Sequence, residues 1–233
     1  MRLATWNINS VRLRLPLLER FIKEAQPDVI CLQETKCVDA EFPRAAIAAA
    51  GYPHQHICGM KSYNGMAILS RQKLTDTGVL NWQKREDCRH IHARLENGLE
   101  IHNVYVPAGG DIPDPEANPK FVHKLGFVEE QASWWRARND NRSRMLLGDL
   151  NIAPMEHDVW SHRQMIDVVS HTPQEIERLT AMQQAHGWID ALRYFVPPEE
   201  KLYTWWSYRA QDWKKSNRGR RLDHIWVTPD LSK

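Results

Sequence analysis

The sequence predicts an α/β protein with more than one β-sheet. Stretches that alternate polar and apolar residues, the pattern of strands, are interleaved with stretches whose apolar residues recur at helical spacing. Two neighbouring strand-like stretches are joined by Glu96-Asn97-Gly98, which is typical of a hairpin turn, so a purely parallel sheet is not expected. No repeat, low-complexity linker or domain boundary interrupts the sequence, and we therefore expect one domain over residues 1–233.

The first part of the chain predicts two strands with a helix between them. Residues 2–9 alternate with period two, and residues 28–34 form a second strand-like run. The segment LPLLERFIKEA at 15–25 has helical spacing and is followed by Gln-Pro-Asp, a plausible helix stop. Residues 40–50, which are rich in alanine, predict a short helix that ends at Gly51.

The remaining elements alternate between strands and long helices. Four strands are predicted at 65–70, 74–80, 90–95 and 99–106. A long helix is expected from about 120 to 138, followed by the apolar strand 144–150 and a helix over 172–186. Strands at 203–208 and 221–228 end the sequence.

The composition is ordinary for a soluble globular protein, with 42% hydrophobic and 26% charged residues and a net charge of +2. The N-terminus lacks the apolar segment of a signal peptide, and no apolar run approaches the ~18 residues that span a bilayer. We therefore expect a cytoplasmic protein with no membrane partner. The four cysteines show no CxxC spacing, so we expect reduced thiols.

Polar residues recur at the ends or faces of predicted strands. They are Asn7, Glu34, Asp149, Asn151 and Asp223. Any one of them alone is best explained as a turn or cap residue, but the recurrence is harder to explain that way, because a carboxylate at the end of an apolar strand needs a partner or a metal. Oxygen-rich sets suit a hard cation such as Mg²⁺, whereas the histidines and cysteines have no zinc spacing.

Six blocks of sequence together resemble one protein family. They are TWNINSVRLRL, DVICLQETK, NVYVPAGG, LLGDLNIAP, YTWWSYR and NRGRRLDHI. In this order they resemble the exonuclease III family of abasic-site endonucleases, within the larger group of metal-dependent phosphodiesterases that includes DNase I. The resemblance runs from Met1 to about Thr228. It implies a four-layer α/β sandwich of two packed mixed sheets flanked by helices.

The resemblance implies a Mg²⁺-dependent DNA repair nuclease, with Mn²⁺ as a possible substitute. Its substrate would be double-stranded DNA with abasic sites or 3′ ends, cut 5′ to the abasic site, with 3′→5′ exonuclease and 3′-phosphatase activities besides. Hydrolysis needs a base for water, compensation for charge at phosphorus and help for the departing 3′-oxygen, and these residue types can supply all three. We expect the enzyme to act as a monomer.

Site residues follow from the resemblance, block by block. Glu34 resembles the principal metal ligand, with Asn7 beside it, and Asp149 the residue that activates the attacking water. Asn151 resembles the donor that orients Asp149 and stabilises developing charge, and both also belong to the expected metal site. Tyr105 resembles the active-site tyrosine at the scissile phosphate. Without the family, its simplest explanation is a strand-end aromatic whose hydroxyl is merely hydrogen-bonded.

Asp223 resembles the aspartate that holds the family's active-site histidine. In a strand, successive side chains point to opposite faces, so Asp223 would share a face with Arg221 and Ile225, and His224 would share one with Leu222 and Trp226. Asp223 and His224 are therefore not expected to act as a pair. The family's histidine lies in a later Ser-Asp-His block that this sequence does not contain, and we expect the native chain to continue beyond Lys233.

DNA binding is expected in the C-terminal third. Trp205 and Trp206 alternate across a predicted strand, so one should face the core and one outward. In the family this segment and the position of Leu222 line the pocket for the flipped abasic sugar. The basic run KKSNRGRR, which includes Arg218, would track the phosphate backbone rather than form a merely solvated face. Lys36 could reach phosphate or be solvated.

Three departures from the family pattern affect the balance of activities and the number of metals. Ala108 stands where relatives often carry Asn or Gln, Arg220 where some carry a bulky aromatic, and Asn9 where some carry a second acidic residue. Two alternatives stay open. One is a phosphodiesterase of the same superfamily that acts on another phosphoester. The other is a DNA-binding protein with impaired catalysis, if the native chain ends at Lys233.

Overall fold

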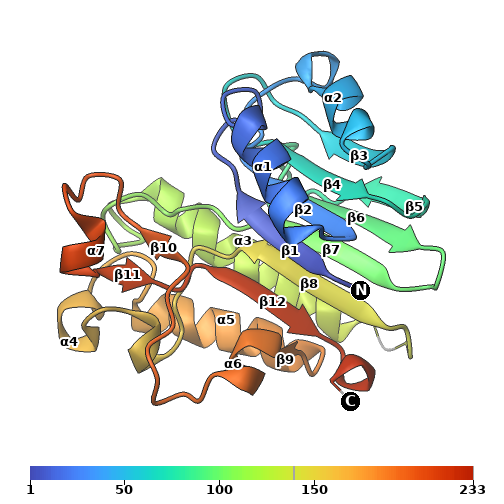
Figure 1. Cartoon of the computed structure of the whole chain (residues 1–233). Helices are drawn as coiled ribbons and strands as arrows, with labels where there is room; N and C mark the ends of the chain where they lie inside the picture. The colour runs from blue at the N-terminus through green and yellow to red at the C-terminus, as the bar shows by residue number, and fades with distance from the viewer. Residues whose placement is uncertain (139, 233) are drawn as a thin grey trace. The chain divides into compact units, whose positions relative to one another are not determined.

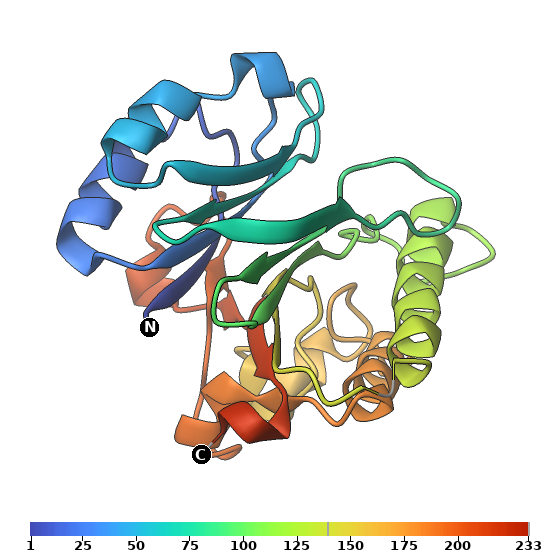
Figure 2. The same cartoon turned by 90° about the vertical axis from the view of Figure 1, so that its right-hand side faces the viewer.

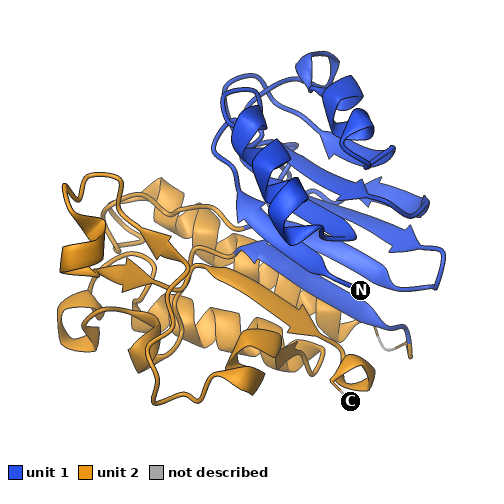
Figure 3. Ribbon diagram, in the orientation of Figure 1, with its two compact units in different colours: residues 1–105, 142–149 blue, residues 106–141, 150–233 orange. Residues whose placement is uncertain are grey.

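The computed structural model describes residues 1–138 and 140–232, whose contacts divide the chain into two units (Figure 3). Unit 1 comprises residues 1–105 and 142–149, and unit 2 comprises residues 106–141 and 150–233. Each unit is described by itself below. The expectation of one domain over residues 1–233 stays a prediction. The expectation that the native chain continues past Lys233 concerns a residue that lies outside the described residues.

Unit 1 contains a first sheet in the order β1-β2-β4-β3. Its strands are β1 (Leu3–Asn7), β2 (Val29–Gln33), β4 (Met66–Ser70) and β3 (His54–Cys58). β1 and β2 are parallel, and the other two pairings are antiparallel, so the sheet is mixed. The helices of this unit are α1 (Leu15–Ala25) and α2 (Arg44–Ala49), with a short 3₁₀ turn η1 (Asp39–Glu41) before α2.

Helix α1 covers one face of the first sheet (Figure 1). A proline is tolerated in the first turn, where a backbone N–H would have no partner within the helix. At the other end Gln26 adopts a left-handed conformation and donates its N–H to Ile22 O at 3.0 Å. Leu18 and Ile22 are buried in one cluster with Ile30 and Leu32 of β2. The apolar residues whose spacing predicted the helix are thus the ones that pack on the sheet.

The second sheet of unit 1 has strands in the order β5-β6-β7-β8. They are β5 (Leu74–Val79), β6 (His90–Leu95), β7 (Glu100–Tyr105) and β8 (Arg144–Asp149). β7 and β8 are parallel and the other pairs antiparallel. The β6–β7 turn contains Gly98 at φ +88°, a conformation that glycine adopts without steric cost. The two sheets pack face to face, and Gln33 Nε2 donates to Asn103 Oδ1 across them at 2.7 Å.

Unit 2 is built on two longer helices, α3 (Pro119–Arg136) and α5 (Pro173–Ala185), which lie side by side (Figure 2). Asn118 caps α3, and Thr172 with Glu175 forms a capping box on α5. The shorter helices and 3₁₀ turns are η2 (Glu156–Asp158), α4 (His162–Met165), α6 (Ala191–Phe195), α7 (Trp213–Ser216) and η3 (Pro229–Leu231). Antiparallel pairs join β9 (Ile189–Asp190) to β12 (Asp223–Val227), and β10 (Trp205–Trp206) to β11 (Gly219–Arg220).

The predicted fold class is confirmed, because the protein is α/β with two mixed sheets and flanking helices. The helix predicted at 15–25 and the strand predicted at 90–95 have those bounds in the structure. Strand β3 was missed because His54, Gln55 and His56 hide its period, and it forms through its pairing with β4. The strand expected over 203–208 is reduced to the two residues of β10.

The expectation of reduced thiols is wrong for two of the four cysteines. Cys58, at the end of β3, and Cys88, just before β6, form a disulfide with their Cα atoms 5.6 Å apart. Cys31 and Cys37 are free and buried. The bonded pair is 30 residues apart, so spacing along the chain carried no signal of it. Separately, no helix among the described residues is long and apolar enough to cross a membrane.

Candidate active site

In unit 1, the carboxyl ends of four strands bring four predicted site residues together. β1 and β2 run parallel, so Asn7 at the end of β1 lies beside the residues that follow β2, where Glu34 is found. β7 and β8 also run parallel, and Tyr105 pairs in register with Asp149. Because the two sheets are packed face to face, these two pairs of strand ends can meet.

The amide of Asn7 joins the two carboxylates of this cluster. Its Nδ2 donates to Glu34 Oε1 at 2.9 Å and to Asp149 Oδ2 at 2.9 Å. The hydroxyl of Tyr105 donates to the same Glu34 Oε1 at 2.7 Å. Asn7, Glu34, Tyr105 and Asp149 therefore form one hydrogen-bonded cluster, which we call the carboxylate cluster.

The backbone around Glu34 takes a conformation that side chains rarely adopt. Glu34 has φ +52° and Lys36 has φ +53°, both in the left-handed region. The turn is held by Ser10 N–H, which donates to Glu34 O at 2.8 Å, and by Thr35 N–H, which donates to Gly65 O at 3.0 Å. Such a conformation in residues with side chains costs free energy and is found most often at functional sites.

The position of Gly148, directly before Asp149, admits only glycine. Its φ is +141°, and a Cβ atom at this position would lie 1.9 Å from Val104 O on the neighbouring strand β7. Any other residue would push β8 away from β7 and would displace Asp149 from its position beside Tyr105. The Gly-Asp pair in LLGDLN is thus required by the close approach of two strands.

The surroundings shift the pKa of two members of the carboxylate cluster. Burial by itself would raise the pKa of Glu34, but hydrogen bonds from Asn7, Lys36 and Tyr105, with the charge of Lys36, hold it below its ordinary value. The pKa of Tyr105 is raised, first by burial and then by the negative charges of Glu34 and Asp149. Glu34 is consequently ionised, and Tyr105 keeps its proton and acts as a donor.

Lys36 is neither simply solvated nor free in this structure. Its Nζ lies 2.7 Å from Glu34 Oε2 and 2.6 Å from Asn9 Oδ1, and its side chain is partly buried. A cation is thus held between a carboxylate oxygen and an amide oxygen beside the carboxylate cluster. The expected role of Lys36 in DNA binding stays a prediction.

The carboxylate cluster fits a hard divalent cation by its donor chemistry. Glu34 and Asp149 supply carboxylate oxygens, Asn7 and Asn9 supply amide oxygens, and the Lys36 ammonium already occupies an oxygen-lined position. Among the described residues there is no group of three or more His, Cys, Asp and Glu that could hold a metal. Mg²⁺ needs only one or two carboxylates because it keeps several waters and substrate phosphate oxygens.

Asn151 is two residues beyond Asp149 in sequence and belongs to unit 2. It has φ +52°, and its Nδ2 donates to Val106 O at 2.9 Å. Its own carbonyl accepts from Lys124 Nζ at 2.8 Å, and Lys124 is fully buried in an ion pair with Glu175. A buried charged pair thus fixes the backbone of Asn151 from the side of α3 and α5.

Asp223 and His224 point to different surroundings, as the strand period predicts. His224 is fully buried, and its Nε2 lies 2.8 Å from Ile152 O. Asp223, at the start of β12, is partly exposed, and its N–H donates to Thr204 Oγ1 at 3.0 Å. Burial raises the pKa of Asp223 to about 6, whereas burial and the charge of Arg221 lower that of His224 to about 4. The two adjacent residues are not a pair.

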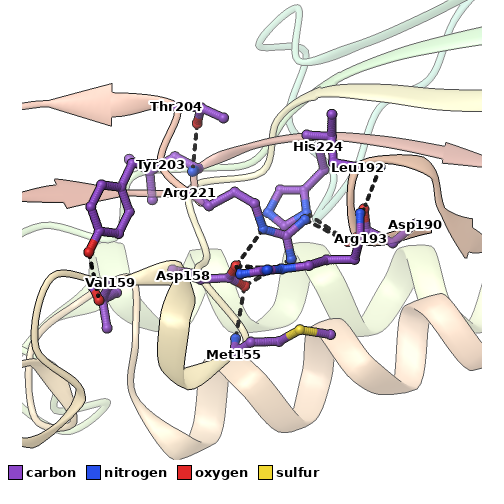
Figure 4. Close-up of polar contacts among 12 residues, drawn as sticks. Met155, Asp158, Val159, Asp190, Leu192, Arg193, Tyr203, Thr204, Arg221 and His224 are labelled. Atoms are coloured by element: carbon purple, nitrogen blue, oxygen red, sulfur yellow. Dashed lines mark hydrogen bonds and ion pairs between the residues drawn. The ribbon is translucent and has the colours of Figure 1, made fainter. Parts of the chain in front are cut away.

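The basic run was expected to track the phosphate backbone, and this expectation is wrong for Arg221. It is fully buried, and its guanidinium contacts both carboxylate oxygens of Asp158 at 2.8 Å and Asp190 Oδ2 at 2.5 Å (Figure 4). Arg193 Nη2 also donates to Asp158 Oδ1, at 2.6 Å. Arg221 is therefore not available to track phosphate, and the burial of its charge is compensated by two aspartates.

The expectation that one of Trp205 and Trp206 faces the core is wrong. Both are half-buried, and β10 pairs with the two-residue strand β11. The guanidinium carbon of Arg220 lies 5.4 Å from the centroid of the Trp205 ring, and the ring of Trp206 packs 5.2 Å from that of Trp213. Trp206 also lines an open pocket with six residues of the segment that follows it, which includes helix α7. This surface is aromatic and basic.

Arg218 and Leu222 lie on either side of Arg220 and differ in exposure. Arg218 is exposed, and its guanidinium carbon lies 4.6 Å from the centroid of the Trp160 ring. Leu222 is 5% exposed, its N–H donates to Thr204 Oγ1 at 3.0 Å, and its carbonyl accepts from Leu150 N–H at 2.8 Å. Arg218 is thus accessible to a ligand, and Leu222 is tied to the segment that carries Asn151.

Sequence reasoning missed several residues that support the site. Thr204 and Lys124 act through the contacts described above, and neither has a local pattern that announces a role. Arg89 is 4% exposed and lies over the ring of Tyr105, with its guanidinium carbon 4.6 Å from the ring centroid. A basic residue just before a strand gives no such signal, because the contact joins residues 16 positions apart.

Comparison with known proteins agrees with this arrangement. The sequence model of the Endonuclease/Exonuclease/phosphatase family matches residues 4–233. Exodeoxyribonuclease III from Haemophilus influenzae is 30% identical over 247 residues, which cover 100% of this chain and 89% of that protein.

Two solved structures are also similar over the whole chain. An AP endonuclease from Archaeoglobus fulgidus has a TM-score of 0.91 and 31% identity, covering 100% of this chain and 88% of that one. The 3′ phosphatase NExo from Neisseria, bound to a product DNA hairpin, has a TM-score of 0.90 and 31% identity with the same coverage.

Proposed function

We propose, from the premise that the chain belongs to the Endonuclease/Exonuclease/phosphatase family and to its exonuclease III group, that it is a DNA repair nuclease. The reaction is hydrolysis of the phosphodiester bond 5′ to an abasic site in double-stranded DNA. Removal of nucleotides and of terminal phosphate from 3′ ends are expected as further activities. The relatives' names describe an exodeoxyribonuclease, an AP endonuclease and a 3′ phosphatase, which supports this set.

The observation that carries the proposal is the carboxylate cluster. One amide, that of Asn7, donates to two carboxylates from different strands, and a buried tyrosine donates to one of them. Two carboxylates kept together at strand ends are costly unless they bind a cation or handle protons. Phosphodiester hydrolysis by this superfamily requires both capacities at one place.

A divalent metal would be held by Glu34, with Asn7, Asp149 and Asn151 as the other expected contributors. We propose Mg²⁺, with Mn²⁺ as a substitute, because all these residues offer oxygen donors. When bound, the ion supplies positive charge that stabilises the oxygens of the reacting phosphate and of the leaving group.

Asp149 is proposed to accept the proton of the attacking water. The water oxygen forms a bond to phosphorus, the bond from phosphorus to the 3′-oxygen breaks, and that oxygen takes up a proton from solvent water, so the products are a 3′-hydroxyl and a 5′-phosphate. Asn7 helps to orient Asp149 by donating to its Oδ2. Asn151 is proposed to stabilise developing charge.

Tyr105 and Asp223 complete the proposed catalytic residues. Tyr105 keeps its proton at neutral pH, so its hydroxyl can donate either to Glu34, as in this structure, or to a phosphate oxygen of bound DNA. Asp223 has a pKa raised to about 6, which places its titration close to neutrality. In the role implied by the family, its carboxylate would orient a histidine side chain.

The DNA-binding residues are proposed to lie in strand β10 and the nearby segments of unit 2 and at Lys36. Trp205 and Trp206 offer half-buried aromatic faces, and Leu222 adds an apolar side chain. Such a surface suits a sugar without a base, while the exposed guanidinium of Arg218 suits phosphate. We propose that the enzyme works as a monomer, which sedimentation of the active protein would check.

The test is a cleavage assay on a duplex with one abasic site in the presence of Mg²⁺. The matched control is the same duplex with an intact nucleotide at that position. Cleavage 5′ to the abasic site should leave a 3′-hydroxyl that a DNA polymerase extends. A competition with small phosphoesters should leave the rate unchanged. Strong inhibition by a small phosphoester would favour the other phosphodiesterase function, and binding without any cleavage would favour a DNA-binding protein.

A further inference from the structure

Arg89 contacts both the ring and the backbone of the proposed active-site residue Tyr105. Its guanidinium carbon lies 4.6 Å from the centroid of the Tyr105 ring, within the range of cation–π interactions. Its Nη1 donates to Tyr105 O at 3.4 Å, and Tyr105 N–H donates to Arg89 O at 2.7 Å. The hydroxyl of the same tyrosine donates to Glu34 Oε1. A displacement of Arg89 would therefore change the position of the Tyr105 hydroxyl.

Arg89 is in turn held by the loops around it. Its Nε donates to Asp87 Oδ2 at 2.7 Å, and its Nη2 donates to Tyr63 Oη at 3.2 Å. Asn64 Nδ2 donates to Asp87 O at 2.8 Å, which joins the loop before β4 to the loop before β6. These contacts come from two irregular segments, so their geometry depends on what fixes the segments to the sheets.

The Cys58–Cys88 disulfide provides that attachment. Cys88 directly precedes Arg89, and Cys58 is the last residue of β3, which pairs with β4 up to Met66. The bond thus ties the residue next to Arg89 to the first sheet across 30 residues of chain. A covalent link of this length removes much of the conformational freedom of the segment it closes.

We propose that Arg89 is a positioning residue for Tyr105 and that the Cys58–Cys88 disulfide holds Arg89 in place, so that catalysis depends on the redox state of this cysteine pair. The proposal rests on the proposed function of Tyr105. Reduction by a dithiol transfers two electrons and two protons to the pair: the Cys58–Cys88 bond breaks, two thiols form, and the reductant becomes a disulfide. The loop that carries Asp87 and Arg89 then loses its tie to β3.

The experiment compares the full-length protein before and after reduction. The thiols of Cys58 and Cys88 are counted by alkylation and peptide mass, and kcat and KM are measured on the abasic duplex with Mg²⁺. We expect reduction to lower kcat by about 10- to 100-fold, the effect of a small misplacement of a catalytic group, with little change in KM. Cys58→Ser should show the same low kcat and no response to the reductant.

Hydrogen exchange provides a readout that does not depend on activity. The amide of Tyr105 donates to Arg89 O, so its exchange should become faster on reduction in the wild type and should be fast at the outset in Cys58→Ser. A wild type that has the bond but cleaves no abasic DNA would contradict the proposed function alone. The exchange measurement would still decide the present inference.

Two arginine variants separate positioning from stability. Arg89→Met should lower kcat, and its reduction should bring no further loss, because the contact that the disulfide maintains is already gone. Arg71→Met is the matched control, since Arg71 also lies over a tyrosine, with 5.3 Å from its guanidinium carbon to the Tyr52 ring centroid. It should alter stability but not the effect of the reductant. An unchanged kcat and Tyr105 exchange after complete reduction would overturn the inference, as would isolation of a protein whose Cys58 and Cys88 cannot be oxidised to the bond.

Discussion

Asn7 Nδ2 and Asp149 Oδ2 are 2.9 Å apart, although 142 residues separate them in the chain. The bond joins the end of β1 in the first sheet of unit 1 to the end of β8 in the second. It also holds the Oδ2 atom of Asp149 against a protein donor. The orientation of the proposed base is thus determined by the packing of two sheets.

Asp149→Asn should lower the rate of cleavage of abasic DNA by about 10²- to 10⁴-fold, the usual contribution of a general base. The amide has nearly the same shape but cannot accept the proton of water. DNA binding should be largely retained in an equilibrium titration with an uncleavable abasic analogue. An equal loss of binding and cleavage would show that the residue is structural.

Chelation of divalent ions with EDTA should stop cleavage, and Mg²⁺ in excess should restore it. Glu34→Gln keeps the size of the side chain but removes the charge, so the Mg²⁺ concentration for half-maximal rate should rise by more than about tenfold. Lys36→Met is the useful comparison, because the ammonium of Lys36 lies 2.7 Å from Glu34 Oε2. Its removal should lower the Mg²⁺ requirement, and a higher requirement would argue against competition between the two cations.

Tyr105→Phe should lower kcat by about 10- to 100-fold, the equivalent of a hydrogen bond to a charged group. The variant also removes one of the donors that hold the pKa of Glu34 below its ordinary value. The pKa of Glu34 should therefore rise, and the acid limb of the pH–rate profile should move to higher pH. An acid limb that moves to lower pH would refute this account of Glu34.

Asp158→Asn should destabilise the fold by about 3–5 kcal/mol, the cost of removing the charge of one partner from a buried ion pair. Arg221 is the other partner, since its guanidinium contacts both oxygens of Asp158 (Figure 4). The pKa of Asp158 is lowered in the folded state, where burial is outweighed by Arg221 and Arg193. The stabilisation that ionised Asp158 contributes is thus fully present above the pKa that Asp158 has in the unfolded chain. It is lost as the pH falls through the lower pKa of Asp158 in the folded protein.

Urea unfolding at several pH values would measure both effects of Asp158→Asn. The variant should have a lower free energy of unfolding at neutral pH. In acid, its free energy of unfolding should depend less on pH than that of the wild type. Lys214→Met is the surface control, because this exposed residue should change stability by less than about 0.5 kcal/mol. A loss as small as that of the control would mean that the buried ion pair adds nothing to stability.

Asp223→Asn should stabilise the folded protein at neutral pH while impairing catalysis. The folded pKa of Asp223 is raised to about 6 from 3.8, so the folded state favours the protonated form. The unfavourable contribution of Asp223 to stability is absent below its pKa in the unfolded chain. It grows as the pH rises between the unfolded and folded pKa values and is complete above the folded pKa. Thermal melts should show the largest gain for the variant above pH 6 and none in acid. A lower melting temperature at neutral pH would contradict the sign.

Local pattern was sufficient for most of the elements. The apolar spacing of residues 15–25 places Leu18 and Ile22 on one face, and that face is the buried one. The alternation from Asp223 to Trp226 likewise separates a buried His224 from a partly exposed Asp223. The roles of Glu34, Asp149 and the other site residues came from resemblance and stay predictions, although the structure brings four of them into hydrogen-bonding contact.

By itself the sequence determined the fold class, the approximate positions of the long helices and which polar residues stand at strand ends, because these depend on periodicity over a few residues. Tertiary structure decided the partners. Arg221 stood in a basic run and is buried between Asp158 and Asp190, and Cys58 and Cys88 form a bond that their spacing did not indicate. Such contacts join residues tens of positions apart, and the cost of burying a charge, or the reach of a disulfide, is known only once the chain has brought the partners together.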